Sequence, residues 1–373
     1  MNYRQSICIV LFAFLGLNIG RVSAQILTDT SIQPTVLAAV EANYNYDFRE
    51  AEEQIKKIKA KYPNHPLATM LSATGMYWQY LPIADNPKAS AQYVALLNLC
   101  IGQAEVLAKT NETEATFFLL ACHSFLAMQE ADKEETLKAV GQAKKTYSYM
   151  KTGMKMVERN PEFYFSTGLF NYYIEQYPAD HPIVRPFMFF FQDGNKKTGL
   201  QQLEIGAKKA TFTKTEAAYY LVYIFLKHEN AYQKAHQIAI QLHEKYPNNA
   251  LYETRLAESL LFLGKYDEAQ ILIKNLLNKP FKVINTSAQI FEGLVQEKKF
   301  KNDKIATEIY QKALLNKPNK RFTADYHGLA HCGLARIALR NNNPALAKKH
   351  YKLALDNSEY ASIITEAKLF LDK

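Results

Sequence analysis

Cysteine, glycine, proline and long apolar runs are scarce in this chain of 373 residues. Each of these scarcities excludes a class of protein. One Trp and four Cys are present, and four cysteines are too few for a disulfide-stapled scaffold of this length. With 14 Gly and 13 Pro, the chain is neither collagen-like nor rich in long low-complexity segments. No apolar run reaches the roughly 20 residues that a membrane-spanning helix needs. We therefore expect a globular or repeat protein.

Motifs that carry catalysis or bind cofactors are also missing. Gly293, Gly328 and Gly333 are isolated and follow no expected strand, so they do not form a phosphate-binding loop. The sequence has no Gly-x-Ser-x-Gly motif and no calcium-loop pattern. We therefore expect a protein that is not an enzyme and that uses no cofactor and no metal.

The first 24 residues have the features of an export leader. Arg4 supplies a positive charge, residues 7–17 are apolar, and Val22-Ser23-Ala24 places small or modest side chains before a cleavage site. Cys8 lies inside the apolar run and lacks the small preceding residue of a lipidated cysteine. We expect cleavage after Ala24 and a periplasmic, envelope-associated or secreted protein without an integral membrane span; an uncleaved anchor is the alternative.

What the chain has in abundance is basic charge and aromatic rings. Its formal net charge is +9, with 24 Tyr and 21 Phe. A basic balance can indicate a nucleic-acid partner, but the lysines stand in scattered pairs such as Lys56-Lys57 and Lys348-Lys349 along expected helices. That pattern is typical of solvated helix faces, and we expect no nucleic acid. The rings suit helix–helix contacts.

A repeat is visible in the C-terminal half. Residues 219–247 and 251–280 each hold two amphipathic helices, and each closes on a proline. The small residue of the second helix is Ala235 in one unit and Ala269 in the next, 34 residues apart. A period of 34 residues is that of tetratricopeptide (TPR) repeats. Equivalent alanines are Ala51, Ala306 and Ala347. The pairs Asp47/Glu50 and Asp267/Gln270 predict capping boxes.

These residues resemble the TPR family, over about 30–62 and 213–373. The resemblance, to an exported bacterial member, implies an all-α fold, a right-handed TPR-like α-solenoid of stacked antiparallel helix pairs. We expect a signal peptide (1–24), an N-terminal helical region (25–212) and C-terminal repeats (213–373). The middle, 67–206, lacks the alanine and proline and is expected to be degenerate. Its helices are expected at 66–80, 88–108, 113–129, 132–158, 161–177 and 196–209. Residues 177–195, rich in Pro and Phe, predict an interrupting loop whose Phe187–Phe191 run fills a seam or meets a partner.

The resemblance also implies a binding groove lined by the first helix of each pair. Inward positions on that basis mix rings and cations, which suits an extended, acidic peptide or its C-terminal carboxylate. The residues carried over are Tyr220, Lys227, His228, Phe262, Phe291, Lys298, Arg336 and Arg340. They depart from the lysine/asparagine clamp of chaperone-binding members.

Histidine and cysteine give weaker signals. His327 and His331 are four apart on an expected helix and could share a zinc ion, but Cys332 diverges and no third ligand is evident. Cys100 and Cys122 flank the turn at Asn111 symmetrically, so the two sulfurs could form a disulfide or lie reduced in the core.

Two functions are compatible with these observations. The first is an exported scaffold or adaptor that binds protein or peptide partners in the cell envelope. The alternative is a non-catalytic accessory protein that binds a ligand such as a glycan through the aromatic-rich 161–193 region.

Overall fold

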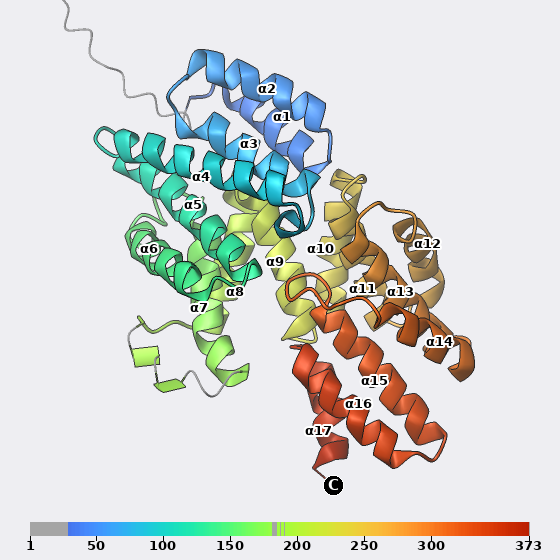
Figure 1. Ribbon diagram of the computed structural model, residues 1–373. Helices are drawn as coiled ribbons and strands as arrows, with labels where there is room; N and C mark the ends of the chain where they lie inside the picture. Colours follow the sequence, from blue (N-terminus) through green and yellow to red (C-terminus); the bar gives the residue numbers. More distant parts are fainter. Residues whose placement is uncertain (1–28, 181–184, 187, 190, 373) are drawn as a thin grey trace, which may run out of the picture.

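The computed structural model describes residues 29–180, 185–186, 188–189 and 191–372, and in these ranges it contains 17 α-helices and no strand (Figure 1). The expected leader, residues 1–24, lies outside the described residues, as do Phe187 and Phe190. The helices are α1(Gln33–Tyr44), α2(Phe48–Lys61), α3(Pro66–Gln79), α4(Pro87–Leu107), α5(Glu112–Asp132), α6(Thr136–Met154), α7(Phe163–Asp180), α8(Lys196–Lys209), α9(Lys214–Lys227), α10(Tyr232–Lys245), α11(Ala250–Phe262), α12(Tyr266–Leu276), α13(Lys282–Lys298), α14(Asp303–Ala313), α15(Ala324–Arg340), α16(Pro344–Asn357) and α17(Ala361–Leu371).

Each helix packs against the next one along the chain, so the fold is an all-α solenoid, as expected. The first helix of a pair also meets the first helix of the following pair, for example α11 against α13 and α13 against α15. The array continues across the expected boundary after residue 212, where α8 packs on α9. Helix positions in the middle agree with the sequence-based ranges to within a few residues.

Six helix pairs share one turn, which the sequence pattern did not reveal. Each turn contains one residue in the left-handed region, and the following N–H bonds to a carbonyl five or six residues back in the first helix. This arrangement satisfies carbonyls at the end of that helix, as in a Schellman-type C-cap. The left-handed residues are Tyr46, Glu134, Asn230, Gly264, Lys301 and Asn342, with φ between 51° and 73°.

The small residue follows each of these turns at a fixed distance. Ala51, Ala235, Ala269, Ala306 and Ala347 all come five residues after the left-handed residue and are buried. The same spacing selects Ala139 in α6, five residues after Glu134. The expectation that the middle lacks the alanine is therefore wrong for the α5–α6 pair. The proline that closes most of the other units is absent there.

Three local expectations need correction. α7 continues through Pro178 to Asp180, so the interruption begins later than residue 177. A proline in a last turn removes one helical hydrogen bond, and here Arg185 Nε donates to the Pro178 carbonyl at 3.0 Å. Neither expected capping box forms: Asp47 is the N-cap without a side-chain cap bond, and Asp267 binds Lys299 instead.

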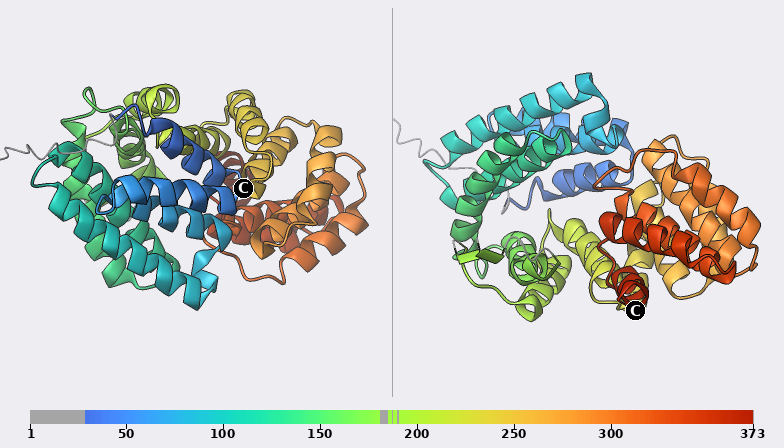
Figure 2. Two further views of the ribbon diagram at one scale, coloured as in Figure 1. Left: turned by 90° about the horizontal axis from the view of Figure 1, so that it is seen from above. Right: turned by 60° about the horizontal axis from the view of Figure 1, so that its bottom comes forward.

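The array curls until its N-terminal pairs meet its C-terminal half (Figure 2). Tyr44 of α1 donates its hydroxyl to Glu216 of α9 at 2.9 Å, and Asn249 donates to the Tyr44 carbonyl at 2.8 Å. Farther along, Arg321 forms two hydrogen bonds, of 3.0 and 3.1 Å, with the Asp132 carboxylate at the end of α5. These contacts, which we call the Tyr44 and Arg321 closures, join segments 172 to 205 residues apart. These contacts therefore tie the N-terminal helices to the C-terminal half of the array.

Candidate partner-binding surface

The cations expected to line a groove are held in ion pairs within the chain. Lys227 is buried, its Nζ lying 2.5 Å from Asp325 and 3.2 Å from Glu359. Burial alone would lower the pKa of Lys227, but these two carboxylates raise it above its usual value. A lysine so neutralised is a poor first contact for an acidic peptide, because its partners would have to leave.

The other expected cations all form ion pairs with Glu297. Its buried carboxylate lies 2.7 Å from Arg336, 3.5 Å from Arg340 and 3.8 Å from Lys298. Burial would raise the pKa of Glu297, but hydrogen bonds and charge from Arg336 lower it overall. This Glu297 network, on α13 and α15, ties neighbouring units together. Glu366 and Asp303 complete it by pairing with Arg336 and Arg340 respectively.

The expected ring positions divide between core and interior. Phe291 is fully buried against Tyr326, with ring centroids 4.9 Å apart. Phe262 stacks on Tyr232 at 4.9 Å. Tyr220 and His228 are half-buried. A partner role for these residues stays a prediction, but Phe291 could touch a partner only after the fold had opened.

A different set of side chains, all of them tyrosines, faces the interior. It comprises Tyr77 of α3, Tyr173 of α7, and Tyr219, Tyr220 and Tyr223 of α9, all of them half-buried. Ring centroids of consecutive members on α9 lie 5.7 and 6.2 Å apart. We call this set the inner tyrosine surface. The sequence-based groove included only Tyr220 of this set, and the 161–193 region included Tyr173. Tyr77, Tyr219 and Tyr223 were not predicted.

Electrostatics show that members from distant helices share one environment. Burial raises the pKa of Tyr220 to about 12, and Glu216 contributes in the same direction. Burial likewise raises the pKa of Tyr77 and Tyr173, with Tyr220 acting on both. Phenols with such shifts are largely surrounded by protein, although part of each side chain still reaches solvent. The phenols of Tyr77, Tyr173 and Tyr220 therefore stay neutral at physiological pH.

Buried polar contacts hold this surface in shape. Arg255 donates to Tyr219 Oη at 3.1 Å and pairs with Glu258 at 2.6 Å. Glu258 in turn accepts from the hydroxyls of Tyr326 and Tyr360. At the start of α9, Glu162 accepts hydrogen bonds from the N–H groups of residues 211–213, at 2.7 to 3.2 Å. A carboxylate there complements the partial positive charge of the helix N-terminus.

The two cysteines that flank Asn111 come together as the turn predicts. Both are free, fully buried thiols, and contact with Cys100, added to burial, raises the pKa of the Cys122 thiol. A disulfide between them stays a prediction.

The histidines do not converge as the zinc alternative requires. Both ring nitrogens of His327 contact backbone carbonyls, of Thr323 and Asn316, at 2.8 and 2.9 Å. His331 instead meets His350 of α16, with 3.2 Å between the two Nδ1 atoms. Across the described ranges, no group of three or more His, Cys, Asp or Glu could hold a metal ion.

Rings of the 161–193 region, on which the glycan alternative rests, point in several directions. Tyr164 and Tyr172 are buried, whereas Tyr177 and Phe189 are exposed, Phe189 by 75%. Phe191 is exposed and packs edge-on against Tyr147. The described part of the phenylalanine run is therefore not a buried seam.

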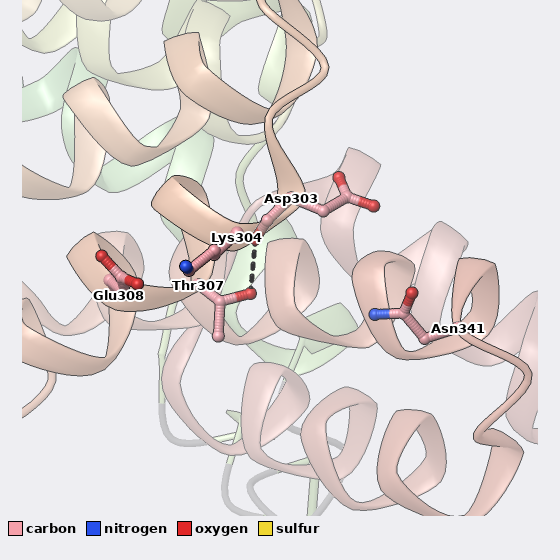
Figure 3. A pocket seen from close by; sticks show the side chains of 5 residues that line it. All are labelled: Asp303, Lys304, Thr307, Glu308 and Asn341. Atoms are coloured by element: carbon pink, nitrogen blue, oxygen red, sulfur yellow. Dashed lines mark hydrogen bonds between the residues drawn. The ribbon is translucent and has the colours of Figure 1, made fainter.

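Two shallow depressions lie outside the inner surface. One, of about 460 Å³, is lined by Asp303, Lys304, Thr307, Glu308 and Asn341 (Figure 3). Its Asp303 carboxylate is paired with Arg340, and its Thr307 hydroxyl donates to the Asp303 carbonyl at 2.7 Å. The other, of about 400 Å³, lies at the end of α7 beside Arg185 and Met188. The polar contacts described in the two depressions, those of Asp303, Thr307 and Arg185, are all made within the chain.

Comparison with known proteins gives no further identification: neither a family model nor a curated protein matches the chain. The structure itself shows a helical, repeat-like array. Within the described ranges, no helix has the length and apolar character required to cross a membrane.

Proposed function

We propose that this protein is an exported, TPR-like scaffold of the cell envelope that binds a segment of a partner protein on its inner tyrosine surface. The single observation that carries the proposal is this set of half-buried phenols, which three helices distant in sequence bring together. Tyrosine is enriched in binding hot spots because a rigid, amphipathic ring gives much contact area at little entropic cost.

The charges around the surface refine the expected partner. Arg255, Arg321 and Lys227 each pair with a carboxylate of the chain. A partner segment therefore meets ring faces and hydroxyl groups more than unpaired charge. An uncharged segment with apolar or aromatic side chains suits this surface better than the acidic peptide that sequence reasoning favoured.

Affinity capture from an envelope extract of the source organism tests the proposal. Wild-type protein should retain a defined protein, whereas Tyr220→Ala, which removes a ring from the centre of the surface, should lose at least ten-fold in captured amount. Tyr80→Ala removes an exposed ring outside this surface and serves as the matched control. Equal capture by all three proteins, or no protein partner with any of them, would refute the proposal.

A glycan ligand is the second candidate, because Tyr173 of the 161–193 region belongs to the inner tyrosine surface and Phe165 lies beside it. The Phe165 ring is 5.5 Å from that of Tyr220. Envelope oligosaccharides titrated into the protein would favour this candidate if they bound and if Tyr173→Ala abolished the binding. If calorimetry shows that oligosaccharides bind the protein and that no captured protein does, the protein is a glycan-binding protein and not a scaffold.

A further inference from the structure

The contact between His331 and His350 brings two metal-ligating atoms together outside the surface described above. His331 lies on α15 and His350 on α16, their Nδ1 atoms are 3.2 Å apart, and the ring planes differ by 30°. Both side chains are half-buried, so solvent and small ions can reach them. No other described histidine pair shows this nitrogen-to-nitrogen contact.

A hydrogen-bond contact between two Nδ1 atoms requires that at least one of them carries no hydrogen, so at least one ring is neutral. In a neutral pair at this distance, one Nδ1 carries hydrogen and the other accepts it. If the donor ring moves its proton to Nε2, both Nδ1 lone pairs become free without net loss of a proton.

The separation of these nitrogens fits two ligands of a single ion. Imidazole nitrogens bind zinc at about 2.0–2.1 Å, so two tetrahedral ligands lie about 3.3 Å apart. We infer that His331 and His350 bind one divalent transition-metal ion that prefers imidazole, such as Cu²⁺, Ni²⁺ or Zn²⁺, and thereby clamp α15 to α16. Water fills the remaining coordination positions, because the described residues supply only two protein ligands.

Neighbouring candidates do not join the site. The sulfur of Cys332, next to His331 in sequence, accepts from Arg336 Nη1 at 3.2 Å. His327 has both ring nitrogens occupied by carbonyls. The inference is independent of the proposed scaffold function, since the inner tyrosine surface uses none of these residues.

Two metals test the site on the whole protein. Cu²⁺ added at one equivalent under argon should give an electron paramagnetic resonance signal with coupling to two nitrogens. Ni²⁺ titrated by calorimetry should bind with a stoichiometry near one and raise the melting temperature, as expected for a ligand of the native state. His331→Gln and His350→Gln should each weaken Ni²⁺ binding at least ten-fold, and the double variant should lose the two-nitrogen signal.

His243→Gln, which changes a half-buried histidine of α10, is the control and should bind as wild type does. Circular dichroism shows whether each variant is folded, and His350→Gln alone suffices if the His331 variant is not. Unchanged affinity in the folded variants, or a copper signal without coupling to two nitrogens, would overturn the inference. The pair would then be only a hydrogen bond between helices.

Discussion

At the scale of single residues, the side chains that determine this structure are charged groups whose partners lie far away in sequence. Glu297 and Arg336 are 39 residues apart, and Lys227 and Asp325 are 98 apart. When each helix is considered by itself, Lys227 of α9 and Arg336 and Arg340 of α15 suggest an open cationic groove. Only the superposition of neighbouring units reveals the carboxylate that faces each cation, so a sequence alone could locate these residues but not their partners.

Glu297→Gln tests the Glu297 network. The variant leaves Arg336 without its buried counter-charge, and loss of one partner of a buried pair typically costs about 3–5 kcal/mol. The pKa of Glu297 is lowered by folding, so its stabilising effect is complete above the unfolded pKa of about 4.3 and disappears as the pH falls through the folded pKa. Urea unfolding should therefore show a large loss at pH 7 that shrinks below about pH 4.

Glu268→Gln is the matched control for that experiment. Glu268 is exposed and pairs with Lys265, at 3.5 Å. Such surface substitutions usually stay within about 0.5 kcal/mol. A Glu297→Gln variant as stable as this control at pH 7 would show that the network contributes nothing to the fold.

At the scale of helices, close packing depends on small residues at defined positions. Tyr310 of α14 lies between Gly293 of α13 and Gly333 of α15, and a Cβ added at either glycine would come within 2.6 or 2.5 Å of its ring. The sequence showed these glycines to be isolated and therefore unsuited to a phosphate loop. Their packing role became visible only when three helices were placed together.

Gly293→Ala and Gly333→Ala should each destabilise the protein by about 1–3 kcal/mol, because overpacking a dense core forces neighbours to shift. Gly102→Ala is the control, and it should change the free energy of unfolding in the opposite direction. Gly102 is exposed in the middle of α4 and has no atom within 4 Å of an added Cβ. Alanine there should stabilise by about 0.5–1 kcal/mol through helix propensity. Urea midpoints of the three variants check the ranking, and equal effects would contradict the packing account.

At the scale of the whole molecule, the helices and their order were predictable, whereas the closure was not. The turn that joins α5 to α6 repeats that of the recognised units, and Ala139 follows it at the same distance, although no proline closes this unit. The inner tyrosine surface went largely unrecognised because Tyr77 and Tyr173 acquire common surroundings only when the chain curls. A repeat period gives the packing of adjacent units but does not specify how far the array bends.

The Arg321 closure is the part of that curl most open to test. Arg321 and Asp132 are each about one-quarter or less exposed and bind through two hydrogen bonds. Arg321→Asp places two carboxylates opposite each other, so the closure should separate while the helices on either side stay intact. Small-angle scattering should then give a radius of gyration above that of the wild type, with unchanged helical content.

The charge-swapped variant Arg321→Asp/Asp132→Arg restores an opposite pair and should return the scattering curve to that of the wild type. It also links shape to function. If the inner tyrosine surface binds the partner in its closed form, Arg321→Asp should weaken capture and the swapped variant should recover it. If the closure instead limits access, Arg321→Asp should speed association. An unchanged radius with unchanged binding would mean that the Arg321 closure neither holds the curl nor acts on the surface that it adjoins.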